Sequence, residues 1–124
     1  MKVNVITDDA PKAEHILSQG ITVNGVIYLS GQIHNKPDGT MVDGSVEEKF
    51  DQIMENITAI LKAADVSLEN VIKVVVYVTD MSQMPKLNEV YPTYFSEPFP
   101  VREAVCVKEL PLGATIEISV VAAK

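Results

Sequence analysis

The sequence has few of the residues that cross-link small proteins or hold metal ions. Among its 124 residues are one cysteine and two histidines. A single cysteine excludes an intrachain disulfide framework and fits a reducing compartment. His15, His34 and Cys106 do not have the spacing of a zinc site. A chain of this length buries roughly two-thirds of its unfolded surface, so we expect a fold without a metal or other cofactor.

Long apolar runs and positive charge are also lacking. No run approaches the ~18 apolar residues that a membrane span requires, and residues 1–9 lack the apolar core of a signal peptide. The net charge of −7 argues against binding nucleic acid or anionic membranes. We therefore expect a soluble, cytoplasmic protein with no nucleic-acid or membrane partner.

The composition that remains is that of an ordinary globular domain. Hydrophobic residues make up 47% and charged residues 22% of the chain, and its length predicts one domain over residues 1–124. The sequence contains no GxSxG elbow, phosphate-binding glycine loop or dinucleotide-binding fingerprint. Familiar catalytic signatures therefore do not identify a function.

Alternation and β-branched residues predict six strands. They are Val3–Ile6, Gly20–Val23, Val26–Ser30, Val71–Thr79, Val101–Val107 and Thr115–Ala122. Asn24-Gly25 predicts a two-residue hairpin between the second and third strands. Residues 71–79 are nearly all apolar, which is typical of a central strand covered on both faces.

Two helices interrupt the strands. Ser45 and Glu48 have capping-box spacing, and an apolar stripe follows them from Val46 to Ala64. Asp80 or Ser82 can cap the second helix, in which Pro92 removes the helical partner of the Asn88 carbonyl. The order β-β-β-α-β-α-β-β predicts an α+β domain with both helices on one sheet face. Self-association is the expected cover for the other face.

Arg102 and Glu117 are the candidate chemical groups of the last two strands. If these strands formed an antiparallel hairpin, the two side chains would lie nearly opposite one another. An arginine suits a carboxylate ligand, and a neighbouring carboxylate can orient water. The alternative is an ordinary cross-strand ion pair, which the residues alone favour. Cys106, in the same apolar strand, is expected to be a buried small hydrophobe.

Several segments, in order along nearly the whole chain, resemble motifs of the RidA/YjgF family of imine deaminases. The segments are LSGQI (Leu29–Ile33), ENI (Glu55–Ile57), LENVIK (Leu68–Lys73), TDM (Thr79–Met81), NEVY (Asn88–Tyr91) with Tyr94 and Phe95, FPVR (Phe99–Arg102), LP (Leu110 and Pro111) and IEI (Ile116–Ile118). Their number and order make the resemblance far more specific than any one motif.

The resemblance implies a chorismate-mutase-like α+β fold and a homotrimer with ligand clefts between subunits. It also implies cofactor-free hydrolysis of 2-imino acids, or their enamine tautomers such as 2-aminoacrylate, to 2-keto acids and ammonia. By the same resemblance, Arg102 holds the substrate carboxylate and Glu117 positions water. Ser30 and Gly31 line the pocket, and Asn88 contributes near its mouth.

The sequence departs from the family pattern at two positions. Leu17 stands where the family commonly has a tyrosine that faces the ligand, and Ala104 stands where it often has a cysteine. Both residues are expected in the substrate pocket, and Leu17 makes its wall more apolar. The departures leave an alternative open: a trimer that binds small carboxylates without turnover, or acts as a regulator or chaperone. His34, just after LSGQI, is expected to be a loop histidine.

Overall fold

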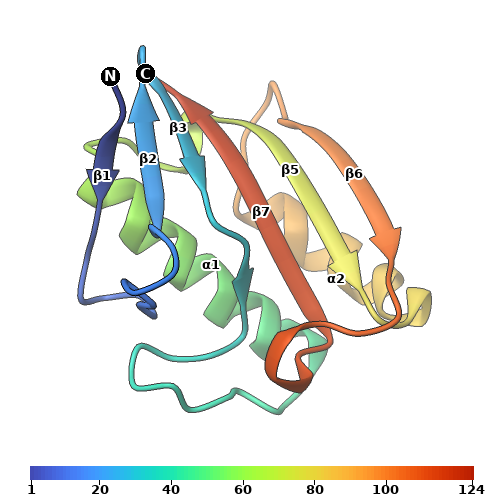
Figure 1. The fold of residues 1–124 in the computed structure, drawn as a ribbon. Coiled ribbons are helices and arrows are strands. Elements are labelled where there is room, and N and C mark those ends of the chain that lie inside the picture. The colour runs from blue at the N-terminus through green and yellow to red at the C-terminus, as the bar shows by residue number, and fades with distance from the viewer.

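The computed structural model describes residues 1–124 and joins all of the strands in one mixed sheet, with two helices behind it (Figure 1). The sheet order is β1-β2-β3-β7-β5-β6, and the short β4 also pairs with β7. The strands are β1 Val3–Val5, β2 Gly20–Val23, β3 Val26–Leu29, β4 Gln32–Ile33, β5 Val71–Val78, β6 Val101–Cys106 and β7 Ile116–Ala123. The helices are α1 Val46–Ala63 and α2 Met84–Val90. The α+β architecture predicted from the sequence is confirmed.

Local sequence signals account for the first hairpin and the long helix. Asn24 and Gly25 both have positive φ, 50° and 79°, as the tight turn between β2 and β3 requires. At the start of α1, the Glu48 N–H donates to the Ser45 hydroxyl, and the Glu48 carboxylate accepts from the Ser45 N–H. This capping box satisfies backbone donors that the first helical turn leaves free.

The two faces of the sheet differ in what covers them. Alternate residues of β7, from Ile116 to Ala122, are buried against the helices. The residues between them, from Glu117 to Ala123, are only half-buried and lie on the face away from the helices, which we call the open face. The same alternation holds along most of β5, where Val75 and Tyr77 lie on the open face. The chain itself therefore covers β5 fully on one face, not on both.

The prediction that the last two strands form a hairpin is wrong. Strand β5 lies between them: β6 pairs with β5 in parallel, and β7 pairs with β5 antiparallel. The connection from β5 to β6 contains α2, and a crossover of this length brings the chain back in the parallel direction. The segment 107–115 then passes the end of β5 to reach its other side, as Figure 1 shows.

His34 lies in a loop as expected but is buried, whereas Cys106 differs from expectation. His34 is 2% exposed, and its Nε2 accepts from the Thr115 N–H at 3.0 Å, so Nδ1 carries the proton and donates to the Val42 carbonyl at 2.8 Å. Burial lowers the pKa of this imidazole and favours the neutral form that both bonds require. The histidine thus ties the end of β4 to the start of β7. Cys106 is exposed on edge strand β6 rather than buried.

Candidate functional site

Arg102 lies on the helix-side face of β6, where α2 supplies its partners. Its register partner is Val74 of β5, whose side chain points toward the helices. The Arg102 Nη1 donates to the Asn88 Oδ1 at 2.9 Å, and Cζ lies 4.8 Å from the centroid of the Tyr91 ring. Asn88 and Tyr91 are three residues apart, so they share one side of the helix. The only arginine of the chain is therefore held on two sides.

The Tyr91 ring is a rigid support for the guanidinium. It is 7% exposed and packs against Phe50 and Phe95, with centroid separations of 6.2 and 4.8 Å. Its hydroxyl is buried without a hydrogen-bond partner, and burial raises the pKa of that hydroxyl. A fixed ring fixes the plane of the stacked guanidinium. Since Asn88 takes only one of its five N–H groups, Arg102 keeps donors for a planar anion such as a carboxylate.

Asn88 contacts Arg102 through its side chain, whereas the sequence prediction concerned its backbone carbonyl. Pro92 has no N–H, and the Tyr91 N–H donates to the Leu87 carbonyl, so neither reaches the Asn88 carbonyl. That part of the prediction holds. The contact with Arg102, however, is made by the Asn88 side-chain oxygen. Sequence reasoning also missed Tyr91, although its position three residues after Asn88 in one helix was a usable signal.

Glu117 lies on the open face at the beginning of β7. Its carboxylate makes no ion pair within the chain, and burial raises the pKa of this group above its ordinary value of 4.5. Gly31 permits the position, since a Cβ atom added there would lie 2.5 Å from the Glu117 Oε2. Only glycine leaves room for the carboxylate to lie against this backbone.

Ser30 and Leu17 lie near Gly31 and share a cavity with it. The Ser30 hydroxyl donates to the Ser18 carbonyl at 2.6 Å, and the Ser30 N–H donates to the Gln19 carbonyl at 2.9 Å. These bonds tie the 13–18 segment to the end of β3. Leu17, Ser30 and Gly31 consequently line one cavity of about 230 Å³.

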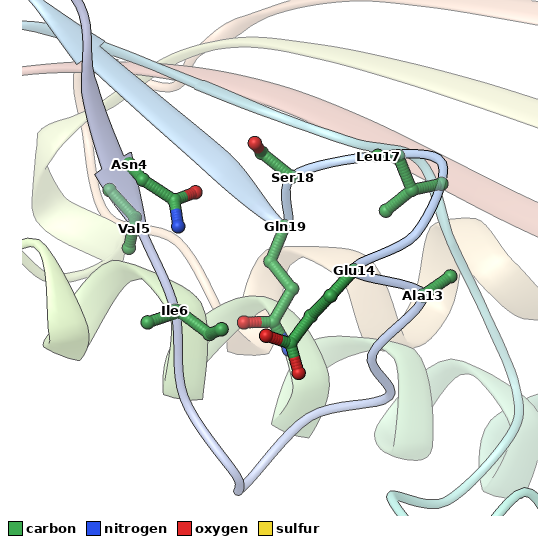
Figure 2. Close-up of a pocket in the computed structure, with 8 residues that line it drawn as sticks. All are labelled: Asn4, Val5, Ile6, Ala13, Glu14, Leu17, Ser18 and Gln19. Atoms are coloured by element: carbon green, nitrogen blue, oxygen red, sulfur yellow. The ribbon is translucent and has the colours of Figure 1, made fainter.

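A smaller cavity of about 130 Å³ lies between β1 and the other side of the 13–18 segment (Figure 2). Gln19 organises this region: its amide donates to the carbonyls of Thr7, Ala10 and Pro11, and its oxygen accepts from the Thr7 N–H. Figure 2 shows the Gln19 side chain extending from the start of β2, beside Glu14, into the loop that follows β1. These hydrogen bonds hold the backbone near Leu17 in place. Leu17 itself lines both cavities.

A single chain does not bring Arg102 and Glu117 together. β5 separates their strands by two strand spacings, about 10 Å, and their partners on β5, Val74 and Tyr77, are three residues apart along the strand. They also lie on opposite faces of the sheet, because the partner of Glu117 on β5 is the open-face Tyr77. Ala104 shares the Arg102 face, two residues farther along β6. The candidate residues thus form two half-sites: Arg102 with Asn88 and Ala104, and Glu117 with Leu17, Ser30 and Gly31.

No three His, Cys, Asp or Glu side chains gather closely enough to bind a metal ion. No helix combines the length and apolar composition needed to cross a membrane.

Comparison with known proteins places the chain in a family. The family model described as Endoribonuclease L-PSP matches residues 7–124. A RutC family protein of Pyrococcus horikoshii is 44% identical over 125 residues, covering 100% of this chain and 99% of that protein. The 2-iminobutanoate/2-iminopropanoate deaminase of Mus musculus is 40% identical over 119 residues, covering 95% and 88%.

Solved structures show the same fold. RidA from the Antarctic bacterium Psychrobacter has a TM-score of 0.93 and 38% identity, covering 98% of this chain and 99% of that one. TdcF of E. coli, solved with bound serine, has a TM-score of 0.91 and 30% identity, covering 98% of each chain. The chain therefore belongs to the Endoribonuclease L-PSP family, which is the RidA/YjgF family that its motifs resemble.

We predict that Gly31→Ala lowers the pKa of Glu117 toward 4.5. The added methyl group displaces the carboxylate toward water, and losing burial favours the ionised form. Carboxyl NMR titration, with Glu117→Gln to assign the resonance, measures this shift. Gly44→Ala is the matched control, because its methyl group would lie 2.5 Å from the Glu48 carboxylate, away from this site. An unchanged Glu117 titration in Gly31→Ala would contradict the assignment.

Proposed function

We propose that this protein hydrolyses reactive 2-imino acids and their enamine tautomers, such as 2-aminoacrylate, 2-iminopropanoate and 2-iminobutanoate, to 2-keto acids and ammonia. The observation that carries the proposal is the Arg102 guanidinium, held by Asn88 and Tyr91 with most of its donors free. The similarity to a mouse enzyme named for this deamination supports it.

In the proposed reaction, Arg102 binds the substrate carboxylate through two parallel N–H···O bonds. The stacked Tyr91 ring and the Asn88 oxygen fix the orientation of the guanidinium, which in turn fixes the plane of the bound carboxylate. A carboxylate held in this way places the adjacent C=N carbon at a constant position. Arg102 thus supplies orientation and charge neutralisation rather than proton transfer.

Glu117 positions the water that attacks. Its ionised carboxylate accepts a hydrogen bond from the water, whose oxygen forms a bond to the imine carbon while the C=N electron pair moves to nitrogen. The water gives up a proton to Glu117 and the nitrogen takes up a proton, giving a tetrahedral amino alcohol. Transfer of the hydroxyl proton to the nitrogen and cleavage of the C–N bond then release ammonia and the 2-keto acid. One water is consumed and no electron acceptor is required.

The active unit in this proposal contains more than one copy of the chain. Arg102 and Glu117 lie on opposite faces of one sheet, so a substrate that touches both must lie between two chains. The open face carries half-buried apolar residues, among them Val75 and Val121, and another copy would cover them. We propose that the assembly is a homotrimer, in which each cleft combines the Arg102 half-site of one copy with the Glu117 half-site of the next.

RNA cleavage and binding without turnover are less well supported. The net charge is −7, and the Arg102 half-site offers one cation rather than a basic groove for phosphates. A protein that only binds carboxylates would need Arg102. It would not need a second group such as Glu117, whose pKa is raised by burial. The proposed setting is the cytoplasm, a reducing compartment compatible with the single exposed Cys106.

We expect Arg102→Ala to abolish acceleration of imine decay, and Arg102→Lys to retain a small part of it. Lysine keeps the charge but loses the planar pair of donors, so KM should rise by about 10- to 100-fold. The assay generates 2-iminobutanoate with a threonine dehydratase and traps survivors with semicarbazide.

The control is Lys62→Ala, which removes one exposed cation from α1 and should leave the rate unchanged. Equal activity of wild type and Arg102→Ala would contradict the role of Arg102. If correctly folded wild-type protein leaves the imine lifetime unchanged, the proposed activity itself is wrong.

We expect the activity to rise with pH along an acid limb whose midpoint lies above 4.5. Burial raises the pKa of Glu117, so the carboxyl stays protonated to a higher pH than usual and orients water only once it is ionised. The measurement is kcat/KM against pH, corrected for uncatalysed decay. Glu117→Gln should lower kcat and remove this limb. A limb that persists with the same midpoint in Glu117→Gln would assign it to another group.

A further inference from the structure

Leu112 has a backbone conformation that does not suit leucine. It lies in the short 3₁₀ helix η4 (Pro111–Gly113) with φ 56° and ψ 26°, in the left-handed region. The β-carbon is crowded there, and asparagine or glycine is tolerated better. The Leu112 side chain is also 75% exposed, so packing in the core does not offset this strain. Neither local conformation nor burial explains a leucine at this position.

Leu112 lines the same 230 Å³ cavity as Leu17, Gly31 and Ile33. Leu17 is 44% exposed. Ile33 is the cross-strand partner of Glu117, and Gly31 lies against the Glu117 carboxylate. Two exposed leucines from distant parts of the chain therefore border a cavity whose lining includes two residues next to the proposed water-positioning group.

We propose that Leu17 and Leu112 form an apolar wall that receives the substrate side chain, so that the preferred substrates are 2-imino acids with branched aliphatic side chains. This inference rests on the proposed function, because it places the imine carbon next to Glu117 and the rest of the substrate farther into the cavity. Ile33 extends the same apolar surface toward the carboxylate. The substrate carboxylate reaches Arg102 of another copy.

The hydrophobic effect sets the size of the expected preference. Full burial of one methylene group strengthens binding by about fourfold. A 4-methylpentanoate skeleton has three more carbons than a propanoate skeleton, and the cavity is open on one side. We therefore expect the branched ligand to bind about tenfold more tightly than the short one, less than the roughly 60-fold of complete burial.

The test compares two 2-keto acids, the stable products, by calorimetric titration of the full-length protein. Wild type should bind 4-methyl-2-oxopentanoate about tenfold more tightly than pyruvate, and the double variant Leu17→Ser/Leu112→Asn should reduce the ratio to about twofold. Ile16→Asn is the matched control: Ile16 is 73% exposed and adjacent to Leu17 but does not line the cavity. It should keep the tenfold ratio.

Measurements of thermal stability distinguish substrate binding by Leu112 from a purely structural role. Leu112→Asn relieves the left-handed strain, so its Tm should equal or exceed that of wild type while the preference falls. A tenfold ratio that survives in the double variant, or a ratio near one in wild type, would overturn the inference. A double variant with a changed sedimentation coefficient would also overturn it, because the leucines would then hold copies together.

Hydrolysis rates distinguish failure of the inference from failure of the proposed function. An L-amino-acid oxidase supplies the 2-imino acids of leucine and alanine for direct comparison. Faster hydrolysis of the leucine-derived imine, lost in the double variant, supports both ideas. Equal hydrolysis of both imines contradicts the inference alone. The keto-acid preference without hydrolysis of either imine supports the apolar wall and contradicts the deaminase.

Discussion

The position of β5 between β6 and β7 determines what this chain can do alone. The α2 crossover makes β6 parallel to β5, while β7 returns antiparallel on the other side. Arg102 consequently points toward the helices, and Glu117 points to the open face. An ion pair between them, which would neutralise both groups, is thereby prevented. Each group instead remains available at a surface where another copy can supply its complement.

The two half-sites are prepared by different physical means. Arg102 is restrained by contact, since the Asn88 oxygen and the Tyr91 ring limit its orientation without neutralising its charge. Glu117 lies close to the Gly31 backbone, and its partial burial raises the pKa of its carboxyl group. His34 supports the second half-site indirectly by joining the end of β4 to the start of β7. The restraint on Arg102 and the burial of Glu117 therefore depend on different residues.

Local signals predicted most of the fold, whereas the sheet order could not be read from them. The Ser45 capping box and the Asn24-Gly25 turn depend on neighbouring residues, and both were predicted correctly. The pairing of β6 depends on the path of a long crossover, and alternation within a strand does not encode its neighbour. For the same reason the sequence predicted the Arg102 and Glu117 candidates but wrongly placed them opposite one another. Tyr91 was missed because an apolar helix position ordinarily indicates core packing alone.

The proposed complete site takes Arg102 from one copy and Glu117 from another. Subunit exchange between Arg102→Ala and Glu117→Gln proteins tests this directly through imine decay. Each variant alone should be nearly inactive, and random 1:1 exchange in a cyclic trimer should restore about a quarter of wild-type activity, because one cleft in four combines both intact groups. No recovery after demonstrated exchange would show that the two groups do not share a site between copies.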